Sequence, residues 1–405
     1  MQRHLLILIG GHLATAPRVQ KEAAAASRAG FRVSVRGMSW DSDLLDEDRQ
    51  LAANCSAHFE PLVDLSSRSL GSILVRLELK LSRLLYRHFG LVTPLSFGPT
   101  ARLMLREALH LRPDLVMVHS EAGLWSGKKL LEHGFRVGVD FEDWFSEDLT
   151  EAQRRERPIE AMRNLEHHLL NRSAPVFTTS EAMSVALSEF SGGIRRPTAI
   201  PNAFPVEKSH CSILRPTGSP LRFYWFSQTI GPERGLEELA EAVEGLPGNW
   251  EIHLRGNLRG YQDWFDETFL AVPRDRLFLH APVSNADLSA ESAEFDIGLA
   301  LEKPISRSRD LTASNKIFEY LRSGLAVIAS KTKGQLEVME RSPKAGWLVD
   351  LEDPDSLRDL LSRCLGDPSS VQRAREGALL AAEEIWNWDS YDEQIRNELS
   401  DALRT

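Results

Sequence analysis

The sequence predicts two α/β domains, each a doubly wound, Rossmann-like parallel sheet with helices on both faces. Three observations lead to this fold class. The chain has 405 residues, which is too long for one ordinary core and fits two domains of about 200 residues. Short segments that are apolar throughout alternate with amphipathic segments of helical period, as in buried parallel strands joined by helices. This alternation stops at a polar stretch and then begins again.

The first half begins with an apolar strand, predicted over residues 5–9, that leads into the turn Gly10-Gly11-His12. A helix is predicted over residues 17–29, because Pro17 suits a first helical turn and Gly30 follows the last one. Further strands are predicted over residues 31–36, 115–119, 136–141, 176–179 and 198–200.

The second half repeats the pattern after a polar stretch that contains Pro and Ser, which we interpret as a linker over residues 206–220. The predicted domains are therefore residues 1–205 and 221–385, and the last helix, within residues 386–405, is expected to pack back on the first domain. Ligands of doubly wound sheets bind outside the carboxyl ends of the strands, so the site is expected in the cleft between the domains. Strands of the second domain are predicted over residues 221–226, 250–254, 276–280, 296–301, 326–329 and 347–349.

Composition excludes several classes of protein. The net charge of −10 argues against a general nucleic-acid binder, which needs a basic surface. The three cysteines, Cys55, Cys211 and Cys364, are far apart, so neither a disulfide framework nor a zinc site is expected. The apolar run at residues 5–9 is too short for a secretion signal or a membrane span, and we expect a cytoplasmic protein.

Residues 311–330 carry the most informative pattern. Ser314 or Thr312 is placed to cap a helix that ends before Gly324, and an apolar strand follows directly. The free N–H groups of such a helix start suit a pyrophosphate, and Lys316 adds a full positive charge there. Glu319, one turn later, is suited to accept hydrogen bonds from ribose hydroxyls. The alternative is an ordinary capped helix with an exposed Lys–Glu pair.

This segment resembles the nucleotide-sugar-binding stretch of the retaining GT-B glycosyltransferases of family 4. Weaker likenesses follow in the family's order along the chain. They are the turn at Gly10-Gly11, the strand Val116-Met-Val-His119, Val176-Phe-Thr-Thr-Ser-Glu181, Ile200-Pro-Asn202 and the stretch from Tyr224 to Gly235. The resemblance implies a GT-B fold whose first domain faces the acceptor and whose second binds the nucleotide-sugar, as in enzymes of polysaccharide biosynthesis.

The resemblance assigns roles to individual residues. Arg234 stands where the family has the lysine that contacts the donor diphosphate, and arginine binds phosphate at least as well. Glu319 corresponds to the glutamate that contacts the ribose, and His119 to a histidine beside the transferred sugar. Gly10 and Gly11 allow the backbone to approach the donor closely.

Two positions depart from the family pattern. Gln228 replaces an arginine of the donor site, and Leu311 replaces the first glutamate of its Glu-x7-Glu motif. Glu302 and Asp310 are nearby acidic replacements, and cations that restore charge at the phosphates are Arg307, Arg309 and Lys316.

The acceptor is expected to meet His12 and the loop of residues 140–144, whose Glu142 and Asp143 follow a strand and suit sugar hydroxyls. The alternative is that these carboxylates lie in solvent. We expect no cofactor and no metal, because positive side chains and a helix start can stabilise the leaving diphosphate. Three Asp-x-Asp pairs are interpreted as exposed surface, and they are Asp41/Asp43, Asp46/Asp48 and Asp353/Asp355.

Residues 68–88 are predicted to form one amphipathic helix with a leucine stripe on one side and a basic stripe on another, and Glu78 is their single acid. One interpretation is peripheral contact with a membrane or a lipid-linked acceptor. The favoured interpretation is a packed helix whose leucines meet the sheet and whose basic residues meet water.

The leading functional prediction is a metal-independent, retaining glycosyltransferase that moves a sugar from a nucleoside-diphosphate-sugar to a saccharide or lipid-linked acceptor. One alternative is a non-catalytic nucleotide-sugar-binding protein or scaffold, which Gln228 and Leu311 favour. Another is a nucleotide-sugar 2-epimerase. A Rossmann dehydrogenase is not expected, since the first turn lacks the GxGxxG spacing.

Overall fold

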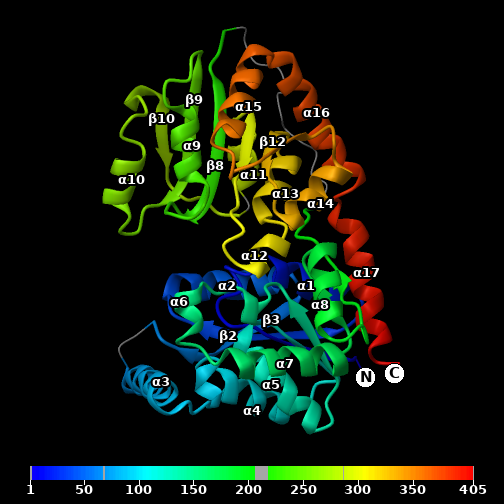
Figure 1. Ribbon diagram of the computed structural model, residues 1–405. Coiled ribbons are helices and arrows are strands. Elements are labelled where there is room, and N and C mark those ends of the chain that lie inside the picture. Colours follow the sequence, from blue (N-terminus) through cyan, green and yellow to red (C-terminus); the bar gives the residue numbers. More distant parts are fainter. Residues whose placement is uncertain (1, 67–68, 206–217, 286, 405) are drawn as a thin grey trace. The chain divides into compact units, whose positions relative to one another are not determined.

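The computed structural model describes residues 2–66, 69–205, 218–285 and 287–404 (Figure 1). The chain divides into two compact units, each built on its own parallel sheet. Unit 1 comprises Met1–Ile200 with Ser390–Thr405, and unit 2 comprises Pro201–Asp389. This two-sheet α/β architecture confirms the predicted fold class. Most of the predicted linker, residues 206–217, lies outside the described residues.

Unit 1 contains a seven-stranded parallel sheet in the order β3-β2-β1-β4-β5-β6-β7. Every residue of β1, β4 and β5 is buried, which explains why these segments are almost entirely apolar, with His4 and Asp140 as the exceptions. The strand order reverses between β1 and β4. The strands are β1 His4–Leu8, β2 Arg32–Ser39, β3 Ala57–Asp64, β4 Leu115–Val118, β5 Val137–Phe141, β6 Val176–Thr178 and β7 Thr198–Ala199.

Helices lie on both sides of this sheet, with α1 and α2 on one side and α4, α5 and α7 on the other (Figure 1). Pro17 occupies the first turn of α1 and Gly30 follows its end, as predicted. The helices are α1 Pro17–Arg28, α2 Ser42–Asn54, α3 Leu70–Phe89, α4 Ala101–Leu111, α5 Ser120–Glu132, α6 Glu151–Arg154, α7 Ile159–Arg172, α8 Glu181–Phe190 and α17 Trp388–Asp401.

The last helix, α17, belongs to unit 1. Its Ile395 and Leu399 are buried, and Thr198 at the sheet edge donates a hydrogen bond to Glu398. Asp392 forms an ion pair with Arg28 of α1. The C-terminal segment therefore completes the core of a unit whose other residues lie about 200 positions earlier.

Unit 2 contains a six-stranded parallel sheet in the order β10-β9-β8-β11-β12-β13. Its order reverses between β8 and β11. A single core surrounds this sheet and includes Phe223, Trp225, Trp250 and Phe265. The strands are β8 Leu221–Thr229, β9 Trp250–Asn257, β10 Leu277–His280, β11 Ile297–Ala300, β12 Ala326–Ser330 and β13 Gly346–Val349.

The helix predicted after residue 314 is α13, and the structure confirms its sequence signals. The Ser314 side chain accepts the hydrogen bond of the Lys316 N–H, and Gly324 has a positive φ just after the helix. The helices of unit 2 are α9 Leu236–Val243, α10 Gln262–Thr268, α11 Leu288–Ser292, α12 Arg307–Leu311, α13 Asn315–Arg322, α14 Lys333–Arg341, α15 Pro354–Gly366 and α16 Pro368–Glu384.

None of the helices in the part of the chain that the structure describes is both long and apolar enough to cross a membrane.

Candidate functional site

Arg234 lies at the point of unit 2 where ligands of doubly wound sheets bind. It follows β8, the strand at which the strand order reverses, in the turn that leads into α9. Its Nη1 donates to the Ser227 hydroxyl at 3.0 Å, and its side chain is half-buried. Within the described residues no carboxylate forms an ion pair with Arg234. A guanidinium held in this way is available to bind an anion.

The turn fits tightly against the neighbouring strand end. Gly235, the residue before α9, has φ +76°, and a Cβ there would lie 2.3 Å from the Leu301 carbonyl oxygen. Glycine is therefore required both by the left-handed backbone and by the close approach of β11. The two contacts fix where Arg234 lies relative to Glu302, which follows β11.

Lys316 and Glu302 form a charged pair in this site. Lys316 Nζ donates to Glu302 Oε1, and the Ser314 hydroxyl donates to the same oxygen at 3.1 Å. Burial would raise the pKa of Glu302, but the charge of Lys316 and the hydrogen bonds from Lys316 and Ser314 together hold the pKa below its usual range. The Lys316 ammonium also lies 5.3 Å from the centre of the Trp225 ring. Glu302 thus stands beside the cation at the start of α13, in keeping with its candidacy as a replacement carboxylate.

The alternative of an exposed Lys–Glu pair on α13 is wrong. Both side chains are buried, and Glu319 binds Arg322 through both carboxylate oxygens, with distances of 3.0 and 2.9 Å. The Ser323 hydroxyl also donates to Glu319. A ribose hydroxyl would therefore have to compete with these partners for the Glu319 oxygens.

The two departures from the family pattern have different surroundings. Gln228 is exposed near the end of β8, whereas Leu311 is buried in α12 and takes part in packing. Asp310, one of the proposed acidic replacements, forms an ion pair with Lys333 and accepts the Lys333 N–H at the start of α14. Arg307 and Arg309, the other proposed cations, lie on α12.

In unit 1, His119 lies directly after β4, where the strand order reverses. Its Nδ1 and Nε2 each lie 2.8 Å from a carboxylate oxygen, the first of Glu142 and the second of Glu22 on α1. Burial alone would lower the pKa of His119, but these two carboxylates outweigh it and raise the pKa well above its usual value. The raised pKa favours the imidazolium form of His119, and burial raises the pKa of its partner Glu22 as well.

The alternative that the carboxylates of residues 140–144 lie in solvent is wrong for Asp140, whereas Glu142 and Asp143 are partly exposed. Asp140 is buried in β5 and pairs with Arg18 of α1 at 2.7 and 3.0 Å. Arg18 also donates to the carbonyl oxygens of Thr178 and Ile200. Glu142 is bound to His119 with about a third of its side chain exposed, and Asp143 is half-buried.

Three of these residues, Glu22, His119 and Asp140, have ligand atoms close enough together for a metal ion. In the structure these groups bond one another and Arg18: His119 Nε2 bonds Glu22, and both Asp140 oxygens accept from Arg18.

His12 and Asp48 form a separate buried pair. His12 Nδ1 donates to Asp48 at 2.6 Å, and His12 Nε2 accepts the Trp40 N–H at 3.0 Å. The expectation that the Asp46/Asp48 pair is exposed is therefore wrong for Asp48, which is fully buried. Both His12 nitrogens are engaged within unit 1, so His12 has no free hydrogen-bonding atom for an acceptor sugar.

The two glycines of the first turn are explained by packing inside unit 1. A Cβ at Gly10 would lie 2.9 Å from the Ser120 Cβ, and one at Gly11 would lie 2.5 Å from the Trp40 ring. The turn therefore packs against the start of α5 and against Trp40. Neither glycine requires a ligand to account for its presence.

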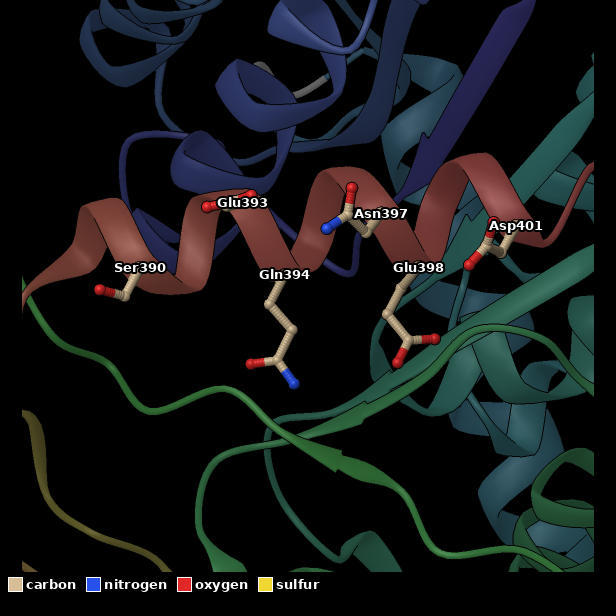
Figure 2. Close-up of a pocket in the computed structure, with 6 residues that line it drawn as sticks. All are labelled: Ser390, Glu393, Gln394, Asn397, Glu398 and Asp401. Atoms are coloured by element: carbon tan, nitrogen blue, oxygen red, sulfur yellow. The ribbon is translucent and has the colours of Figure 1, made fainter.

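A pocket of unit 1 lies along α17 and contains none of the predicted site residues (Figure 2). Three carboxylates line it, so it is unsuited to a diphosphate. The six lining residues are Ser390, Glu393, Gln394, Asn397, Glu398 and Asp401.

Sequence reasoning missed Arg18 and Glu22 as members of the site. The helical periodicity of α1 could have identified them, since both charged residues share a face of this helix with small apolar residues that are buried. Charged side chains on a buried helix face need partners, and here the partners come from β5 and from the end of β4.

Comparisons with known proteins agree with this fold. No protein-family model matches the chain, and no relative is found among curated proteins. Among solved structures, sucrose-phosphate synthase from Thermosynechococcus elongatus aligns with a TM-score of 0.71 and 14% identity over 99% of each chain. HepE from Anabaena, in complex with UDP and glucose, aligns with a TM-score of 0.70 and 16% identity over 98% of this chain and 100% of its own.

A UDP-N-acetylglucosamine 2-epimerase, described as putative, from Listeria monocytogenes aligns less closely, with a TM-score of 0.57 and 13% identity over 95% of this chain and 97% of its own. These likenesses confirm the GT-B fold, with two Rossmann-like domains, that the sequence predicted.

Proposed function

We propose that the chain is a glycosyltransferase that moves a sugar from a nucleoside-diphosphate-sugar to a saccharide or lipid-linked acceptor. The observation that carries the proposal is the Arg234 guanidinium, which bonds Ser227 after the strand where the strand order of unit 2 reverses. Its charge helps to lower the pKa of Glu302, the partner of Lys316. Arg234 has no carboxylate partner within the described residues. The likeness of fold to HepE, whose structure contains UDP and glucose, supports the same ligand class.

The proposed chemistry needs positive charge more than covalent catalysis. A nucleoside diphosphate leaves readily once its developing charge is stabilised, and Arg234, Lys316 and the start of α13 supply that charge. We propose on this basis that transfer does not depend on a metal ion, and from the family resemblance that it proceeds with retention.

The acceptor is proposed to contact unit 1 through Glu142, the one member of the His119 cluster with substantial exposure. His119 holds Glu142 by a charge-assisted hydrogen bond and so fixes where its carboxylate points. In this proposal Glu142 contacts the sugar hydroxyls and His119 acts as a positioning residue.

The test is binding of UDP, GDP, ADP, dTDP and CMP to the purified protein, measured by thermal shift with and without EDTA. A ligand of the native state raises the melting temperature, and we expect one diphosphate to do so in EDTA. Loss of a charged hydrogen bond costs about 1.5–3 kcal/mol, so Arg234→Ala is expected to weaken that affinity by about tenfold to a hundredfold. Arg274→Ala, at an exposed arginine of the same unit, is the matched control.

Turnover separates the three candidate functions. A transferase releases the nucleoside diphosphate when an acceptor sugar is added, and slowly to water without one. An epimerase converts the bound nucleotide-sugar into its 2-epimer without that release. Binding without either product would favour the non-catalytic alternative, which the burial of Leu311 at the family's glutamate position supports.

A further inference from the structure

Helix α3 presents its large apolar residues to the outside of unit 1. Six of its leucine and isoleucine side chains are between 44% and 82% exposed, so the interpretation that the leucine stripe meets the sheet is wrong. A helix packed on a soluble core shows the opposite arrangement, with its apolar stripe inward. The six residues are Leu70, Ile73, Leu74, Leu77, Leu81 and Leu84.

The inward side of α3 is a narrow seam with small polar residues at its buried positions. Ser72 and Ser82 are buried, and the Ser82 hydroxyl bonds the hydroxyls of Thr93 and Ser96 at 2.8 and 3.2 Å. Farther along, the Tyr86 hydroxyl donates to the Arg157 carbonyl oxygen. The helix is thus held to the unit by hydrogen bonds, while its leucines are left without a covering surface.

A basic stripe runs beside the exposed leucines. Arg76, Lys80, Arg83 and Arg87 recur at intervals of three and four, so they share one flank of the helix. All four are exposed, and none forms an ion pair with a carboxylate of the described residues. On a chain of net charge −10, this concentration of unpaired positive charge beside apolar side chains is a local exception.

We propose that α3 lies in the interface of a bilayer that contains anionic lipids. Its leucines would enter the boundary between headgroups and acyl chains, and its basic flank would meet the lipid phosphates, the arrangement of interfacial amphipathic helices. A second copy of the chain suits this face less well. A two-fold contact would bring four unpaired cations from each copy together, with only Glu78 of each helix to offset them.

The test is co-flotation of the full chain with phosphatidylcholine vesicles, with and without phosphatidylglycerol. We expect binding to the anionic vesicles that weakens at high salt and is much lower on pure phosphatidylcholine. Because each basic side chain near an anionic surface contributes about fivefold, Lys80→Glu with Arg83→Glu should reduce binding at least about tenfold. Leu77→Gln with Leu81→Gln should also reduce it at least about tenfold.

Matched controls keep the result specific to α3. Arg102→Glu with Arg106→Glu reverses two exposed charges on α4, and Leu270→Gln removes a leucine of unit 2 that is 78% exposed. Both controls should bind as the natural sequence does, and circular dichroism should show that every variant is folded. Nucleotide binding should be unchanged in the α3 variants, so failure here is distinguishable from failure of the proposed function.

Three results would overturn the proposal. They are no binding of the natural sequence to anionic vesicles, equal binding to both vesicle types at all salt concentrations, and equal loss in the control variants. Dimerisation that the Leu77/Leu81 variant abolishes, without any vesicle binding, would identify a second copy as the occupant instead.

Discussion

Both ring nitrogens of His119 bond carboxylates, so base chemistry at His119 would first have to break one of these hydrogen bonds. The sequence assigned His119 to the transferred sugar and Glu142 to the acceptor as separate contacts. The structure joins them in one hydrogen-bonded cluster. A substrate that binds there meets a carboxylate that His119 already holds in place. Binding is therefore favoured, because less conformational entropy is lost in ordering the Glu142 side chain.

Glu166 provides a test by pH. It is buried on α7 and accepts hydrogen bonds from the Ser146 hydroxyl, the Ser146 N–H and the Trp144 indole, yet burial raises its pKa from 4.5 to about 7. Between these values the native state holds a proton that the unfolded state has lost. Stability is therefore expected to fall as pH rises from 4.5 to 7, by about 3 kcal/mol in total.

The measurement is urea unfolding at several pH values for the natural sequence and for Glu166→Gln, which cannot ionise. Subtracting the two curves removes the contribution of other titrating groups. The difference between the two free energies of unfolding should change between pH 4.5 and 7 and become constant above about pH 7. A difference that does not vary with pH would contradict the raised pKa of Glu166.

The turn between β8 and α9 gives a prediction for Arg234. Gly235→Ala adds a Cβ that would lie 2.3 Å from a backbone oxygen, and it forces a left-handed conformation on alanine. We expect a loss of more than about 2 kcal/mol in stability, since the strain alone costs about 1–2 kcal/mol. Because the turn must shift, nucleotide affinity should fall as well.

Gly245→Ala is the matched control, since Gly245 also has a positive φ but a Cβ there meets nothing within 4 Å. Gly245→Ala should lower the free energy of unfolding only by the backbone strain, about 1 kcal/mol, and should leave nucleotide affinity unchanged. Denaturant unfolding and a nucleotide titration of both variants test this. Equal effects at the two glycines would show that the contact with β11 does not position the turn.

The order of strands and helices could be predicted because each carries its own local pattern. Burial on both faces makes all but one residue of β1 and of β12 apolar, and Ser314 caps α13 by a bond that spans two residues. The orientation of α3 could not be predicted. Helical periodicity tells which residues share a face, but not whether that face meets the protein or its surroundings.

The site could be predicted in part for the same reason. Residues that follow strands closely, such as His119 after β4 and Arg234 in the turn after β8, are located by the strand signal itself. Their partners come from segments far apart in the sequence, as Glu22 is from His119 by 97 residues, and no local pattern marks such a contact. The burial of Leu311 is likewise a property of tertiary packing.

The division of the chain between its units predicts how fragments behave. Residues 201–389 are continuous and contain the whole unit 2 core, so this fragment should fold alone and bind the same nucleotide as the full chain. Residues 1–200 lack α17. Without it, the surfaces that cover Ile395 and Leu399 are exposed, and Arg28 and Thr198 lose their partners Asp392 and Glu398.

We therefore expect fragment 1–200 to melt at a lower temperature than unit 1 does in the full chain. A synthetic peptide of residues 390–405 should raise that temperature progressively as its concentration increases. The peptide should leave fragment 201–389 unaffected, which makes that fragment the control. The same peptide with Ile395→Ser and Leu399→Ser should be inactive, because burial of these two side chains drives its docking. If fragment 1–200 were equally stable with and without the peptide, α17 would be an appendage to unit 1 and not a part of its core.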